Sequence, residues 1–243
     1  MLQNKRMKKT NEIITDLKKD GISIIDSFAN KEQLELLNQE FDEFLSKEHK
    51  GAKHAQYSKG RCARVNTNEY NKDEFPSTNS FFSNKYFYGI ANQYLGNKVN
   101  LNSEIFIVED VVGSKHIAND LHYDVQNTLK FFLYLTETKK ENGAFTCVPG
   151  SHLYTKKYRE VYKDKISYEN RHLTRELDTK KSKEKIPIEG NAGTLIIFDT
   201  DVWHQAGSIS NGTRRVMRGH TRIESQSNQN LSLIKRIWTK IKI

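Results

Sequence analysis

Cysteine and long hydrophobic runs are scarce in this sequence, and each absence excludes a class of protein. The 243 residues include two cysteines, Cys62 and Cys147, which cannot form a disulfide framework or a cysteine-rich zinc site. No apolar stretch approaches the length of about 20 residues that a membrane-spanning helix requires. The basic residues 1–9 are not followed by an apolar segment, so the sequence predicts no secretory signal and a cytoplasmic location.

Positive charge exceeds negative charge, and the excess is unevenly distributed. Lys and Arg total 39 against 30 Asp and Glu, which gives a formal net charge of +9. Residues 151–185 hold eleven basic and six acidic side chains, and residues 5–9 and 235–242 are also basic. The excess is consistent either with a solvated surface or with an acidic partner, which could be a phosphate- or carboxylate-bearing substrate, a nucleic acid or an anionic membrane.

Two helices are predicted near the start of the chain. Apolar residues at helical spacing predict the first over residues 11–19, and Gly21 is placed to end it. Asn30 and Gln33 form a capping-box pattern ahead of the second, which is amphipathic and extends to about Lys47. These segments have the character of a scaffold.

The middle of the chain is expected to be irregular, then helical. Gly51–Ser80 has little periodicity and many polar residues, so we expect a long loop of the kind that often covers a binding site. Phe81–Leu95 is rich in aromatic residues and predicts a core helix.

Short β-strands separated by Gly, Asn and Asp follow and predict an all-β sandwich or barrel. We therefore expect one domain over residues 1–230, with a helical scaffold over 10–96, a β core over 97–225 and a basic insertion over 154–185. Residues 231–243 form a basic amphipathic tail, which could dock on the core or make a peripheral membrane contact.

His122 and Asp124 are the first candidates for a functional site. Residues two apart in a strand point to the same face, so we expect the imidazole and the carboxylate to converge. One histidine and one carboxylate are two of the three ligands of a facial metal triad. The pattern also arises by chance at polar strand ends, so it needs a third ligand elsewhere in the chain.

That third ligand is expected at His204, which follows a predicted strand. Downstream, Asn211-Gly212 is the strongest hairpin signal in the sequence. If the turn has two residues, strand alternation places Arg215 on the face of His204 and points Arg214 away, whereas a bulge would favour Arg214. A guanidinium on that face would bind the far carboxylate of a dicarboxylate cosubstrate.

At these residues the sequence resembles the phytanoyl-CoA dioxygenase family of iron(II)/2-oxoglutarate oxygenases. The resemblance lies in His122-Tyr123-Asp124, in FFLYLTETKKENGAFTCVPGSH, in AGTLIIFDTDVWH and in the downstream arginine. The opening of the chain is also similar to the family's usual beginning, so the resemblance covers roughly residues 12–223.

The resemblance implies both a fold and a chemistry. The implied fold is mainly β with α, a double-stranded β-helix (a cupin-like jelly-roll core) backed by N-terminal helices. His122, Asp124 and His204 would bind Fe(II), and Arg215 would hold the cosubstrate 2-oxoglutarate. Oxygen would be consumed, with release of succinate and CO2, and the presence of Asp124 favours hydroxylation over halogenation.

The substrate is less closely specified. The basic charge suggests a small anionic metabolite, which the middle loop and the basic insertion would bind. Alternatives are an oxygenase acting on a macromolecule, such as a nucleic acid or a lipid-linked substrate at a membrane, and a non-catalytic jelly-roll binding protein. No segment combines basic and aromatic residues in a nucleic-acid stacking pattern, which argues against nucleic acid. The candidate pocket residues are Tyr123, Gln126, His116 and His152.

Overall fold

The computed structural model describes residues 8–96, 98–115, 117–161 and 181–224. The α-helices are α1 (Thr10–Asp20), α2 (Lys31–Ser46), α3 (Pro76–Phe82), α4 (Lys85–Leu95) and α5 (His152–Val161), and two 3-10 helices are η1 (Ile117–Asn119) and η2 (Lys181–Glu184). The strands are β1 (Ile22–Ile25), β2 (Ala52–Tyr57), β3 (Gly60–Asn66), β4 (Val99–Val111), β5 (Leu129–Tyr134), β6 (Phe145–Val148), β7 (Ile186–Ile188), β8 (Leu195–Asp199), β9 (Trp203–Gln205) and β10 (Thr213–Ile223).

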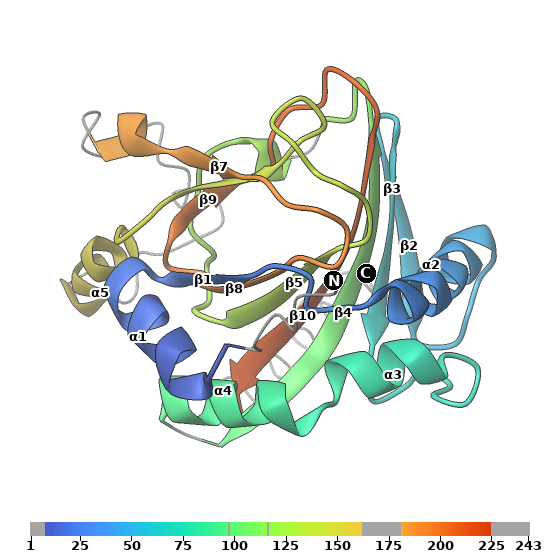
Figure 1. Ribbon diagram of the computed structural model, residues 1–243, viewed down its shortest axis with the longest axis horizontal. Helices are drawn as coiled ribbons and strands as arrows, with labels where there is room; N and C mark the ends of the chain where they lie inside the picture. The colour runs from blue at the N-terminus through green and yellow to red at the C-terminus, as the bar shows by residue number, and fades with distance from the viewer. Residues whose placement is uncertain (1–7, 97, 116, 162–180, 225–243) are drawn as a thin grey trace, which may run out of the picture.

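Two antiparallel sheets make up the β core, and helices lie along the outer side of the larger one (Figure 1). The large sheet has seven strands in the order β1-β8-β5-β10-β4-β3-β2, and the small sheet has three in the order β7-β6-β9. β8 and β10 lie in the large sheet and β9, between them in the chain, lies in the small sheet, so the chain crosses between the two sheets as in a jelly roll. The predicted mainly β fold with helices backing one sheet is confirmed.

Local signals account for the ends of the first two helices. Gly21 ends α1 in the left-handed conformation with φ of 74°, and its N–H donates to the Leu17 carbonyl at 3.0 Å. At the start of α2, the Asn30 side chain accepts a hydrogen bond from the Gln33 N–H, and the Gln33 side chain accepts one from the Asn30 N–H. Both predictions made from these residues are confirmed.

The predicted loop over Gly51–Ser80 is wrong, because this segment forms the hairpin of β2 and β3 and the start of α3. The hairpin forms one edge of the large sheet (Figure 1). With β1 at the other edge, the segment expected to be a helical scaffold also contributes three strands to that sheet, β1 to β3. Its buried residues on β3 are small, Ala63 and Val65, so its alternation is faint in the sequence. The expected single helix over Phe81–Leu95 is divided, since Asn84 caps a separate α4.

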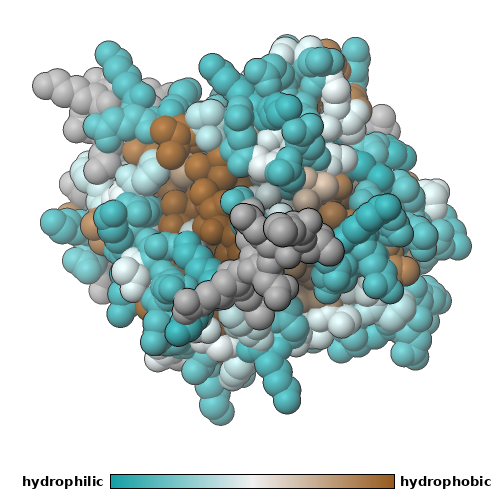
Figure 2. All heavy atoms as spheres, in the orientation of Figure 1, coloured by the Kyte–Doolittle hydropathy of each residue, from teal (hydrophilic) through white to brown (hydrophobic). Residues whose placement is uncertain are grey.

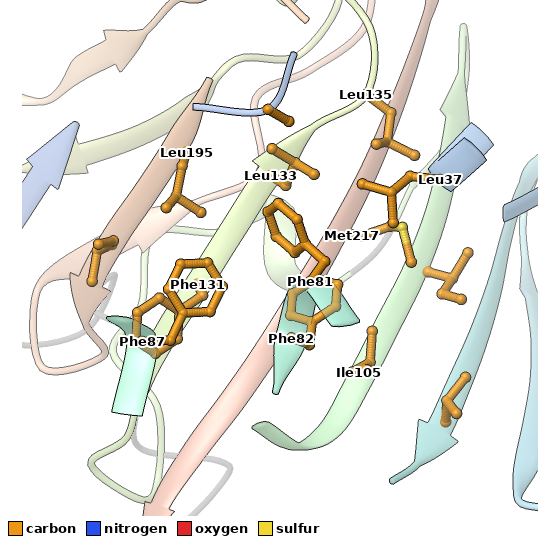
Figure 3. Close-up of a cluster of buried hydrophobic side chains, with 14 of the residues drawn as sticks. Leu37, Phe81, Phe82, Phe87, Ile105, Phe131, Leu133, Leu135, Leu195 and Met217 are labelled. Atoms are coloured by element: carbon orange, nitrogen blue, oxygen red, sulfur yellow. The ribbon is translucent and has the colours of Figure 1, made fainter. Parts of the chain in front are cut away.

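The main core lies between the large sheet and the helices. Side chains from α2, α3 and α4 point toward those of β4, β5, β8 and β10 (Figure 3). Phe87 of α4 stacks on Phe131 of β5 with ring centroids 4.3 Å apart. A second hydrophobic cluster lies between the two sheets and includes Phe132, Phe145 and Phe198. The large sheet therefore has an outer face that packs on helices and an inner face that is directed toward the small sheet.

The exterior is mostly hydrophilic in the view of Figure 2, with hydrophobic residues gathered near the middle of that face. Within the described part of the chain, no helix combines the length and apolar character needed to cross a membrane. The C-terminal tail and residues 162–180 of the basic insertion lie outside the described residues.

Candidate metal centre

His122, Asp124 and His204 come together on the inner side of the small sheet. One ligand atom from each lies within 4.8 Å of the others. The backbones of His122 and His204 pair directly, with N–H···O distances of 2.9 and 2.7 Å, and the Asp124 N–H donates to the Thr200 carbonyl. Two imidazole nitrogens and one carboxylate oxygen on one side of a metal are the donor set of a facial triad.

Backbone carbonyls fix the orientation of both imidazole rings. The Nδ1 atom of His122 lies 2.7 Å from the Asp120 carbonyl, and that of His204 lies 2.7 Å from the Val202 carbonyl. Because a carbonyl can only accept, each Nδ1 carries the hydrogen, and the lone pair of the neutral ring then lies on Nε2. The two Nε2 atoms lie 3.8 and 3.7 Å from Asp124 Oδ1. This anchoring is typical of histidines that bind a metal.

The charges around the triad favour its metal-binding protonation state. Burial, together with the neighbouring His122, lowers the pKa of His204 well below its ordinary value. Burial alone would raise the pKa of Asp124, but the Lys130 ammonium and the two histidines outweigh it and hold this pKa well below its usual range. At neutral pH His204 is therefore neutral and Asp124 is ionised.

Lys130 is a part of this site that the sequence analysis missed. It is 4% exposed, and its Nζ lies 2.6 Å from Asp124 Oδ2. The available signal was a lysine inside the otherwise apolar strand LKFFLY, all six residues of which are buried. A buried lysine is unusual unless it has a partner, and this one stands six positions after Asp124.

A narrow inner chamber of about 40 Å³ extends from the two histidines. Its walls include the rings of Phe132, Phe145 and Phe198, together with Arg214 and Arg218 of β10. A wider outer pocket of about 350 Å³ adjoins it, and the two share Val108, Ala118, Ala206, Arg214 and Arg218 as lining residues. The outer volume lies within the range of small-molecule binding sites.

The prediction that Arg215 shares the face of His204 is wrong. Its guanidinium lies 4.1 Å from the ring centre of Phe41 on α2, donates to Asn38 and pairs with Asp42. Arg214 instead points inward, is 4% exposed, donates to the Gly143 carbonyl and pairs with Asp110. The alternative arginine is thus the one that lines the chamber.

The error arose because residues 205 to 213 do not form the expected two-residue hairpin. β9 belongs to the small sheet, whereas β10 pairs with β4 and β5 of the large sheet. Strand alternation carries from one strand to the next only when the two pair with each other. The chain crosses between sheets here, so the face to which His204 points does not determine the face to which Arg215 points.

The three candidate substrate residues that the structure describes, Tyr123, Gln126 and His152, do not line either cavity. Tyr123 is buried with Val148 and Trp203 on the side away from the metal ligands. His152 is fully buried, and its Nε2 lies 3.2 Å from the Lys18 carbonyl at the end of α1. Gln126 is absent from the lining of both cavities, and His116 lies outside the described residues.

Arg159 of α5 holds together the two segments that carry the metal ligands. Its Nε lies 2.7 Å from Asp201 Oδ1, three residues before His204. Its Nη1 donates to the Val125 carbonyl at 2.7 Å, and its Nη2 donates to the carbonyl of Asp124 itself. One side chain from the start of the basic insertion thereby fixes the spacing of the ligand-bearing segments.

We expect Arg159→Lys to weaken metal binding about tenfold, because loss of a group that positions ligands typically costs 10- to 100-fold in affinity. Lysine keeps the charge beside Asp201 but cannot reach both carbonyls. Titration of the protein with Co(II), followed by visible absorption, measures the affinity. Lys157→Ala, an exposed neighbour on the same helix, is the control and should bind Co(II) normally. Unchanged affinity in a folded Arg159→Lys protein would contradict the positioning role.

Comparison with solved structures finds the same fold in several proteins. The epimerase SnoN, crystallised with Fe3+, alpha ketoglutarate and nogalamycin RO, aligns with a TM-score of 0.65 at 14% identity, over 88% of this chain and 83% of its own. HygX from Streptomyces hygroscopicus, crystallised with nickel, 2-oxoglutarate and hygromycin B, aligns with a TM-score of 0.62 at 11% identity, over 89% and 88%. The carbocyclase SnoK aligns with a TM-score of 0.60 at 16% identity, over 90% and 85%.

No curated protein sequence matches the chain. The family model described as Phytanoyl-CoA dioxygenase (PhyH) matches residues 17–217, which span both sheets, the helices that back the large one and all three candidate metal ligands. The chain belongs to the phytanoyl-CoA dioxygenase family.

Proposed function

We propose that the protein is an Fe(II)- and 2-oxoglutarate-dependent oxygenase that hydroxylates a C–H bond of a small anionic molecule. The observation that carries the proposal is the convergence of His122, Asp124 and His204, with both Nδ1 atoms held by backbone carbonyls, in a chain of this family. The metal and 2-oxoglutarate bound in SnoN and HygX, which share the fold, support the choice of cofactor and cosubstrate.

The donor set fits Fe(II). Two imidazoles and one carboxylate suit this ion, and a facial triad leaves three positions for the cosubstrate and oxygen. Iron and 2-oxoglutarate, when bound, supply the oxidising power for C–H hydroxylation, with release of succinate and CO2. Lys130 keeps Asp124 ionised as a ligand, and the aromatic walls of the chamber restrict water near the metal.

Arg214 is the residue that we assign to the far carboxylate of 2-oxoglutarate. It lines the same chamber as His122 and His204. Its Nη atoms donate to Gly143 and Asp110, while its Nε is buried and has no hydrogen-bond partner among the described residues. A buried unpaired donor is costly, and a carboxylate in the chamber would satisfy it.

Anaerobic addition of Fe(II) and 2-oxoglutarate to the metal-free protein should produce a weak visible charge-transfer band, which tests the proposal. His204→Ala should abolish the band, because two ligands do not hold the iron in the chelated geometry. His49→Ala is the control and should retain it, since His49 packs against Phe44 and Phe75 on the helical side of the large sheet. Absence of the band from the unaltered protein would refute the proposed function.

A further inference from the structure

A row of side chains crosses the inner face of the large sheet from its free edge to the chamber. The register pairs Lys53 of β2 with Arg64 of β3, Arg64 with Phe106 of β4, and Phe106 with Arg218 of β10. Directly paired residues lie on the same face. The Arg64 and Arg218 guanidiniums lie 5.3 and 4.7 Å from the centre of the Phe106 ring. The row therefore places two guanidiniums against one aromatic ring, with the Lys53 side chain one strand beyond Arg64.

Nearby acids balance the positive charge of this row only in part. Like charges directly opposite each other in a sheet are destabilising, and Lys53 faces Arg64. The Lys53 and Arg218 side chains form no hydrogen bond or ion pair with the other described residues, and the Arg218 Nε is buried without a partner. Arg64 pairs with Glu104, but Glu104 also pairs with Arg222. A ligand of negative charge would relieve this arrangement.

These residues line the outer pocket, which leads to the metal centre. Lys53, Arg64, Phe106 and Arg218 all belong to its lining, and Arg218 also lines the inner chamber. Asp110 is the acidic residue of that lining, and it pairs with Arg214. Three strand spacings separate Arg218 from Lys53, a distance of about 14 Å across the sheet. The pocket therefore has an end near the metal ligands, where Arg214 is paired with Asp110, and a cationic end at the hairpin.

We propose that Lys53 and Arg64 bind a phosphate monoester group of the substrate, at the end of the molecule remote from the carbon that is oxidised. Two adjacent cations match the double negative charge of a phosphate monoester, and arginine binds phosphate oxygens through paired N–H groups. That the bound molecule is a substrate rests on the proposed function, but the binding of phosphate itself requires neither metal nor turnover. It names the substrate class as a phosphorylated small molecule.

Calorimetric titration of the metal-free protein with phenyl phosphate tests this site. The double variant Lys53→Met/Arg64→Met should bind phenyl phosphate at least tenfold more weakly than the unaltered protein, because both charged contacts are lost. Lys18→Met/Lys19→Met removes the same charge from the exposed side of α1 and should change affinity less than twofold. The single variant Arg64→Lys keeps the charge but lacks the paired N–H groups, so its affinity should lie between those of the unaltered protein and the double variant.

Three results would overturn the proposal: no binding of phenyl phosphate, equal weakening in both double variants, or binding of benzoate as tight as that of phenyl phosphate. The last would assign the site to a carboxylate. Far-UV circular dichroism establishes that each variant is folded. Since the titration contains no iron or 2-oxoglutarate, its failure would leave the charge-transfer test of the metal centre unaffected, and the reverse also holds.

Discussion

Replacing Arg214 with lysine should weaken the binding of 2-oxoglutarate to the Fe(II)-loaded protein about 100-fold. Lysine keeps the positive charge beside Asp110, so the buried ion pair is preserved. Its single ammonium cannot pair with Asp110, donate to the Gly143 carbonyl and also replace the Nε that we assign to the cosubstrate carboxylate. Loss of one charge-assisted hydrogen bond costs up to about 3 kcal/mol, which corresponds to roughly 100-fold in affinity. Anaerobic calorimetry with 2-oxoglutarate measures the change.

Arg215→Lys is the matched control, since it alters the adjacent residue in the same way. Arg215 lies against α2, so this change should lower stability through its contacts with Asn38 and Asp42 and leave 2-oxoglutarate affinity within twofold. The opposite result, with weakened binding in Arg215→Lys and normal binding in Arg214→Lys, would show that β10 presents its other face to the cosubstrate.

The second large effect concerns folding. Phe87→Ala should lower the free energy of unfolding by about 3–5 kcal/mol, the usual cost of truncating a buried aromatic side chain. The Phe87 ring is 0% exposed and stacks on Phe131, and its centroid lies 5.6 Å from that of Phe28. Its removal therefore leaves a cavity between α4 and the large sheet. Equilibrium unfolding in urea, followed by circular dichroism, measures the loss.

Tyr88→Ala provides the comparison on the same helix. Tyr88 is 45% exposed, so its truncation should cost less than about 1 kcal/mol. Equal destabilisation by the two changes would mean that α4 is not held to the sheet through Phe87.

The parts of the fold that could be predicted depend on interactions between near neighbours in the sequence. Gly21 ends α1 and Asn30 begins α2 because helix caps involve residues within four positions of each other. His122 and Asp124 converge because residues two apart share a face in an extended chain. His204 is predicted as the third ligand from its place after a strand and from the family resemblance, and the structure brings all three side chains together.

The parts that could not be predicted depend on which strands pair. Whether Arg214 or Arg215 faces the chamber depends on the sheet that the chain enters after β9, which neither residue encodes locally. The β2–β3 hairpin was missed because its apolar side consists of small residues. Arg159 and Arg218 acquire their roles only through contacts with segments distant in the chain. Lys130 was the exception, since a charge inside an apolar strand is visible in the sequence.

The position of the β2–β3 hairpin has a consequence for how such an enzyme could diversify. β2 is the terminal strand of the large sheet, and the hairpin pairs with the rest of that sheet through β4 alone. The metal ligands, in contrast, come from β9 and from the segment that pairs with it. Exchange of residues 52–66 for a hairpin of equal length would therefore alter the cationic end of the outer pocket and leave the metal ligands in place. The hairpin residues of the outer pocket and the metal ligands lie on separate segments of the chain, so either set can change without the other.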